Sequence, residues 1–150
     1  CGLGPHECAG VARTRPLARR WAVPKPSVTR RGETPNVAKA MNLVGDVKGT
    51  VAVIIDDMVD TAGTLTQAAQ VIQDLGALEV LACATHPVFS GPALDRIENS
   101  VLSAVVVTNT IPLSEAARES SKIRVMSVAP LLGEAILRIH QNDSVSSLFV

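Results

Sequence analysis

The feature that most constrains the fold is a run of five apolar residues, 51–55 (VAVII), followed at once by Asp56 and Asp57. Four of the five side chains are β-branched, which restricts their rotamers and favours a strand. A continuous apolar run, without alternation, is typical of a strand covered on both faces in a parallel sheet. The run therefore predicts a buried strand that ends at a pair of acids.

The segments after this run alternate between helix and strand patterns. Apolar residues recur at steps of three and four from Leu65 to Leu75, and Gly76 stands where a helix C-terminus is expected. Strands that alternate with helices predict a parallel sheet flanked by helices, so the fold class is α/β. Further strands are predicted at 78–84, 103–109 and 123–128, and further helices at 92–100 and 131–139.

The first third of the chain is less regular. Residues 11–21 have a weak helical pattern that Pro16 interrupts, and residues 22–35 contain three prolines and are predicted as loop or a poorly formed strand. Residues 37–49 are predicted as a short helix that ends in a turn. We therefore expect one domain over residues 1–150, with an irregular stretch at 1–35 and a short extended tail at 141–150.

Composition excludes several classes of function. Basic and acidic residues balance at 14 each, so no overall field attracts nucleic acid or an acidic membrane. One Trp, two Phe and no Tyr leave few platforms for stacking bases, and no apolar run approaches the roughly 18 residues of a membrane span. The three cysteines have no paired spacing. We expect a cytoplasmic protein that binds neither nucleic acid nor a membrane.

The acids and the turn after them form a candidate binding site, because ligands of parallel sheets bind beyond the carboxyl ends of strands. An adjacent pair of carboxylates suits a vicinal diol or a divalent cation. Residues 60–64 (DTAGT) lead into a helix, whose amides and dipole favour a phosphate, and Gly63 allows close approach. Together they predict a site for ribose 5-phosphate. The plainer alternative is a solvated helix start with Asp60 or Thr61 as the N-cap.

The run 53–65 (VIIDDMVDTAGTL) resembles the signature of the type I phosphoribosyltransferase fold, in the version found in ribose-phosphate pyrophosphokinases. Most of the chain, from about Gly10 onward, is similar to the C-terminal half of that family. The similar segments, in order, are NVAKAMNLVGDVKG, ATHPVFSGPALDRIENS, VVVTNTIPL, SVAPLLGEAILRIH and SVSSLF.

The resemblance implies transfer of the diphosphoryl group of ATP to ribose 5-phosphate, with Mg²⁺ as cofactor and with ADP and inorganic phosphate as regulators. It also implies a homo-oligomer, built largely through the other half of the family's enzyme. By matching position, the resemblance implies catalytic contacts to ATP for Arg30 and Arg31 and metal binding for Glu7. It implies ribose binding for Asp56 and Asp57, and binding of the 5-phosphate for Asp60, Thr61, Ala62, Gly63 and Thr64. It implies an allosteric site for Ser144, Val145, Ser146 and Phe149.

Departures from the family pattern leave alternatives open. Thr29 stands where the family has a lysine, and the family's other half is absent from this chain, so we expect the chain by itself to be inactive. One alternative is a non-catalytic regulatory or associated subunit. The other is a salvage phosphoribosyltransferase, although TNTIPL (residues 108–113) and SVSSLF (residues 144–149) favour the synthetase. The tail residues could also belong to a terminal strand that merely packs.

Overall fold

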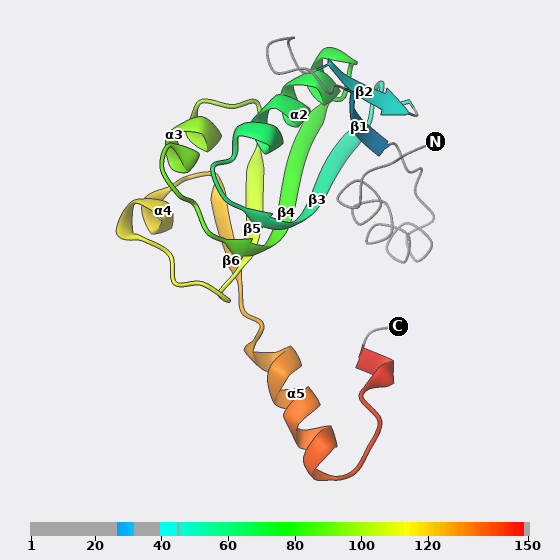
Figure 1. Cartoon of the computed structure of the whole chain (residues 1–150), viewed down its shortest axis with the longest axis vertical. Coiled ribbons are helices and arrows are strands. Elements are labelled where there is room, and N and C mark those ends of the chain that lie inside the picture. The colour runs from blue at the N-terminus through cyan, green and yellow to red at the C-terminus, as the bar shows by residue number, and fades with distance from the viewer. Residues whose placement is uncertain (1–26, 32–39, 45, 149–150) are drawn as a thin grey trace.

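The computed structural model describes residues 27–31, 40–44 and 46–148, and its main body is an α/β unit (Figure 1). Four parallel strands form one sheet in the order β3-β4-β5-β6, so neighbours in the chain are neighbours in the sheet. Helices connect them, as the alternating pattern predicts. The strands are β3 (Val51–Val59), β4 (Glu79–Pro87), β5 (Ala104–Thr108) and β6 (Ile123–Met126), and the helices are α2 (Gly63–Asp74), α3 (Ala93–Glu98), α4 (Glu115–Glu119) and α5 (Ala129–His140).

The core lies between the sheet and the three helices α2, α3 and α4. On β4, Val80, Ala82 and Ala84 are buried, and alternate positions of a strand share one face. Residues from α2, α3 and α4 belong to the same apolar cluster, so these helices cover the same face. The fully buried side chains are small or branched aliphatic ones, among them Val80, Ile97, Leu102, Val105 and Val107.

The strand predicted at residues 51–55 is confirmed. The prediction that both of its faces are covered is wrong within the described part of the chain. Val51 and Val53 are 54% and 44% exposed, whereas Ala52 and Ile54 pack against the core. The reason is that α2, α3 and α4 all pack on the face that carries Ala52 and Ile54, which leaves the side chains of Val51 and Val53 exposed on the other face. A continuous apolar run does not by itself show whether one or both faces of a strand are covered.

A second, two-stranded sheet replaces the structure predicted before residue 45. Strands β1 (Ser27–Arg31) and β2 (Ala40–Val44) pair antiparallel, with Thr29 opposite Asn42. The helix predicted over 37–49 is therefore wrong for Ala40–Val44, and the irregular stretch predicted at 1–35 contains a strand. The pairing satisfies backbone groups of two short segments at once, and no local pattern reveals it. The weak helix predicted at 11–21 lies outside the described residues.

The C-terminal region combines a confirmed helix with a corrected tail. Helix α5 projects away from the sheet in Figure 1, and none of its residues is buried. The apolar stripe predicted on it is present but exposed, with Ile136 at 68% and Ile139 at 66%. Residues Ser146–Leu148 form a 3₁₀ turn rather than an extended piece. Arg138 holds the tail by donating hydrogen bonds to the Ser144 carbonyl (3.1 Å) and the Ser147 hydroxyl.

A lysine just before β6 stabilises the C-terminal end of α3, and its removal tests this contact. The Lys122 ammonium donates to the carbonyls of Ile97 (3.2 Å), Glu98 (2.9 Å) and Ser100 (2.8 Å). We expect Lys122→Met to lower the free energy of unfolding by about 1–3 kcal/mol, because charged hydrogen bonds at a helix C-terminus are lost. Urea unfolding followed by circular dichroism measures this, with the exposed Lys48→Met as the matched control. Equal stability of the two variants would contradict the assignment.

Candidate functional site

The candidate site lies where β3, β4 and β5 reach their carboxyl ends. Strand β3 does not stop at residue 55 but runs through both acids to Val59, so the acids lie within the strand rather than after it. The reason is that β4 is equally long and continues the ladder, with Asp56 opposite Ala84 and Val59 opposite Pro87. Pairing with β4 keeps these polar residues extended, which the apolar pattern alone does not predict.

The two carboxylates do not stand side by side. Successive side chains of a strand leave it on opposite sides, and Asp56 is exposed whereas Asp57 is half-buried. Each carboxylate is oriented locally by the next amide: Asp57 N–H donates to Asp56 Oδ1 (2.9 Å), and Met58 N–H donates to Asp57 Oδ1 (3.0 Å). The expected pair of adjacent acceptors is therefore split between two sides of β3.

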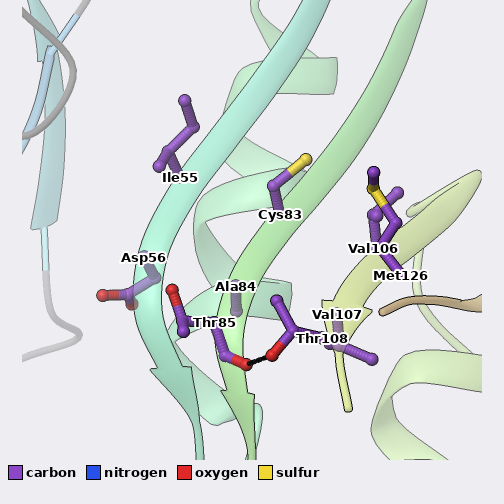
Figure 2. Close-up of a pocket in the computed structure, with 9 residues that line it drawn as sticks. All are labelled: Ile55, Asp56, Cys83, Ala84, Thr85, Val106, Val107, Thr108 and Met126. Carbon is purple, nitrogen blue, oxygen red and sulfur yellow. Dashed lines mark hydrogen bonds between the residues drawn. The ribbon is translucent and has the colours of Figure 1, made fainter. Parts of the chain in front are cut away.

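Asp56 borders a pocket of about 240 Å³ on the sheet (Figure 2). Aliphatic side chains and Cys83 make up most of its wall, and Thr85 and Thr108 lie near its lower end in the figure. The Thr108 hydroxyl donates to the Thr85 carbonyl at 2.6 Å, which links the ends of β4 and β5. The lining residues are Ile55, Asp56, Cys83, Ala84, Thr85, Val106, Val107, Thr108 and Met126.

Cys83 contributes an inert surface to this pocket. Burial raises the pKa of the Cys83 thiol above its ordinary value, because the thiolate loses hydration there. The thiol is therefore protonated at neutral pH, and a protonated thiol is a poor nucleophile. The pocket offers the Asp56 carboxylate and threonine oxygens for recognition rather than a covalent catalyst.

The loop of residues 60–64 leads directly into α2, which begins at Gly63. The N-cap is Ala62, which supplies no side-chain hydrogen bond, so the alternative with Asp60 or Thr61 as N-cap is wrong. The first intrahelical bond runs from Thr66 N–H to the Ala62 carbonyl (3.0 Å). The amides of the preceding residues belong to the helix start, the part of a helix that binds anions.

Two residues from the segment after β4 hold this loop, and the sequence interpretation did not single out either. The Ser90 amide donates to the Asp60 carbonyl (3.1 Å), and the Ser90 hydroxyl donates to the Asp60 carboxylate. Arg96 Nη1 donates to the Thr61 carbonyl at 2.9 Å. Serine and arginine are common surface residues, so only the contact identifies them.

His86, which the sequence interpretation left without a role, lies on β4 beside the threonines. Its Nδ1 forms a hydrogen bond with the Thr110 hydroxyl at 2.9 Å. The Thr110 hydroxyl also donates to the Thr85 carbonyl (3.0 Å), so the histidine is tied to the ends of β4 and β5. These bonds give His86 a structural role at this edge of the sheet.

The remaining predicted site residues are placed only in part. Arg30 and Arg31 lie in β1, whereas Glu7 and Phe149 lie outside the described residues. In the tail, the Ser144 hydroxyl accepts from Ser146 N–H (3.2 Å), and Val145 is half-buried. The structure does not bring this tail to the loop of residues 60–64; Arg138 on α5 holds it instead.

Within 27–31, 40–44 and 46–148, His, Cys, Asp and Glu side chains form no group of three or more that could hold a metal ion. In the same part of the chain, no helix combines the length and apolar character required to cross a membrane.

The four-stranded parallel sheet with its flanking helices defines an α/β protein of the phosphoribosyltransferase-like class. Residues 9–150 match the family model described as phosphoribosyl synthetase-associated domain, and the chain belongs to this family.

Relatives and a solved structure of the same kind are similar over most of the chain. A ribose-phosphate pyrophosphokinase of Listeria ivanovii is 53% identical over 140 residues, covering 93% of this chain and 44% of the relative. One from Staphylococcus epidermidis is 48% identical, covering 98% and 48%. The crystal structure of phosphoribosylpyrophosphate synthetase from Mycobacterium smegmatis superposes with a TM-score of 0.73 at 34% identity, covering 86% of this chain and 42% of that one. The chain therefore spans less than half the length of these relatives.

Proposed function

We propose that this chain is the ribose 5-phosphate-binding half of a ribose-phosphate diphosphokinase. The observation that carries the proposal is the placement of Asp56 and the start of α2 at one edge of the sheet, joined by only a short loop. A carboxylate accepts hydrogen bonds from sugar hydroxyls, and a helix start accepts a phosphate. The match to ribose-phosphate pyrophosphokinases over 93% of the chain supports the same substrate.

In the proposed reaction, the anomeric oxygen of ribose 5-phosphate attacks the β-phosphorus of ATP. A new oxygen–phosphorus bond forms, the bond from the β-phosphorus to the oxygen of the α-phosphate breaks, and AMP leaves. Asp56, which borders the pocket, would accept from the ribose hydroxyls, and the amides of the loop would hold the 5-phosphate. The same role for Asp57, which leaves the other side of β3, stays a prediction that the Asp57→Asn variant tests. Arg30 and Arg31 would offset the charge that develops on the transferred group.

Mg²⁺ is the cofactor that this reaction class uses, because it neutralises the phosphates of ATP. Proteins bind Mg²⁺ through one or two carboxylates plus substrate phosphates, so an exposed carboxylate such as Asp56 suits it without a preformed cluster. Glu7 remains a prediction for a second ligand. We also propose a cytoplasmic homo-oligomer, regulated by ADP and phosphate at Ser144, Val145, Ser146 and Phe149.

The test separates sugar-phosphate binding from turnover. Isothermal titration of the 150-residue chain is expected to show binding of ribose 5-phosphate and at least tenfold weaker binding of ribose, because ribose lacks the charge-assisted bonds of the phosphate. AMP formation from ATP and ribose 5-phosphate is expected to be absent in this chain alone. Equal affinity for the two sugars would exclude the proposed phosphate site, and AMP formation at ordinary enzyme rates would contradict the expected inactivity.

A further inference from the structure

The guanidinium of Arg96 lies directly against the loop that starts α2. Arg96 belongs to α3, and its Nη1 reaches 35 residues back along the sequence to donate to the Thr61 carbonyl at 2.9 Å. A Cβ atom at Gly63 would lie 3.1 Å from Arg96 Nη1 and 3.7 Å from Cζ. The absence of a side chain at Gly63 therefore makes room for this guanidinium, a role that the sequence pattern did not reveal.

The loop needs such support because its backbone is not in a preferred conformation. Ala62 has a φ of 58°, in the left-handed region that residues with a Cβ atom adopt at a cost of roughly 1–2 kcal/mol. Its side chain is buried and cannot cap the helix. Strained positions of this kind persist only where their surroundings determine them, and they concentrate at binding sites.

The bond from Arg96 determines how the peptide between Thr61 and Ala62 is oriented. The carbonyl oxygen of Thr61 and the N–H of Ala62 belong to one planar trans peptide, so they point in opposite directions. Because Arg96 holds the oxygen on one side, the Ala62 N–H is directed to the other side of the loop. Arg96 thereby sets the direction of an amide that adjoins the start of α2.

The positive charge of Arg96 also favours an anion at the start of α2. Among the described residues Glu134 and Arg138 form the one ion pair, so Arg96 has no acidic partner within that part of the chain. A cation beside a helix N-terminus is unfavourable in the absence of an anion, because the helix dipole is positive there. A bound phosphate would reverse this repulsion.

We propose that Arg96 is a positioning residue for the 5-phosphate of the substrate: it orients the Thr61–Ala62 peptide and places a positive charge beside the helix start. This inference rests on the proposed function, because it concerns the same site. It assigns Gly63 a second role as well, that of leaving space for the guanidinium rather than only for the ligand.

The experiment compares Arg96→Met, which keeps the aliphatic stem, with Arg96→Lys, which keeps a cationic donor. We expect Arg96→Met to weaken ribose 5-phosphate binding about tenfold, the loss of one charge-assisted contact, and to leave ribose binding unchanged. Amide hydrogen exchange at Ala62 and Gly63, measured by NMR without ligand, is expected to become faster. Arg96→Lys should restore both properties in large part. Arg118→Met, at an exposed position of the short helix α4, is the matched control.

A second variant tests the contact with Gly63. Gly63→Ala is expected to displace the guanidinium and to weaken ribose 5-phosphate binding in the wild-type background. In the Arg96→Met background the same change should weaken binding by a smaller factor than in the wild-type background, because its collision with the guanidinium is gone and only its effect on the approach of the phosphate is left. Additive effects of the two substitutions would overturn the proposed contact.

Failure of the Arg96 inference can be told apart from failure of the proposed function. If the wild-type chain binds no ribose 5-phosphate, the proposed function fails, and the exchange rates of Ala62 and Gly63 alone decide whether Arg96 orients the loop. If Arg96→Met weakens ribose and ribose 5-phosphate equally, Arg96 only supports the fold and the inference is overturned. Unchanged binding together with unchanged exchange would overturn it as well.

Discussion

Replacing Asp56 by asparagine is expected to weaken the binding of ribose 5-phosphate by about 10- to 100-fold. Hydrogen bonds to a charged acceptor contribute about 1.5–3 kcal/mol, which corresponds to that range of affinity. Asparagine keeps an oxygen that can accept from Asp57 N–H, so the local bond of 2.9 Å can persist while the negative charge is removed. The change therefore tests the charge at the pocket rather than the conformation of β3.

Isothermal titration with ribose 5-phosphate and with ribose measures the effect, and both affinities are expected to fall because the hydroxyls are common to the two ligands. The matched control is Asp46→Asn, an exposed acid before β3 whose Oδ1 accepts from Lys48 N–H at 2.9 Å. Asp57→Asn distinguishes the contribution of Asp57 to binding from that of Asp56, since Asp57 is half-buried and does not line the pocket. Affinity unchanged by Asp56→Asn would remove Asp56 from the proposed ribose contacts.

Truncation of Ile97 is expected to have the largest effect on stability. Its side chain is 0% exposed, and it lies in the cluster that joins α3 to the sheet. We expect Ile97→Ala to lower the free energy of unfolding by about 2–5 kcal/mol, because the change removes buried methyl and methylene groups and leaves a cavity. Urea unfolding followed by circular dichroism measures the difference, and Ile97→Val should lower it by only about 0.5–1.5 kcal/mol.

The matched control is Ile136→Ala on α5, where the isoleucine is 68% exposed. This variant should change stability by less than about 0.5 kcal/mol, as surface substitutions do. The pair tests whether burial, rather than residue type, determines the cost. Similar losses for both isoleucines would show that α5 is packed against other parts of this chain in solution.

The alternating core of the fold could be predicted because its signals are local. Helix α2 follows from apolar spacing and from Gly76, whose φ of 95° requires the freedom of glycine at the end of a helix. Strand β5 and helix α3 follow in the same way. Helix α4 was missed because it is five residues long, although Ser114 caps it by accepting from Ala117 N–H at 3.3 Å.

The candidate site could be predicted only as far as its residues are contiguous. The acids and the loop after them are within ten positions of each other, so the sequence displays them together. Whether Asp56 and Asp57 face one ligand depends on where β3 ends, and that depends on its ladder with β4. Ser90 and Arg96 support the loop from about 30 and 35 residues away, a distance at which no pattern links them to it.

By itself the sequence determined the α/β class, the alternation of strands and helices along the chain from β3 to β6 and the position of the helix start, because hydrophobic spacing and glycine placement act over a few residues. Tertiary structure alone decided that Ala40–Val44 pair as a strand, that the two acids lie inside β3 and diverge, and that Arg96 supports Thr61. These features depend on hydrogen bonds between segments far apart in the chain. Their energies appear only once the backbone has brought the partners together.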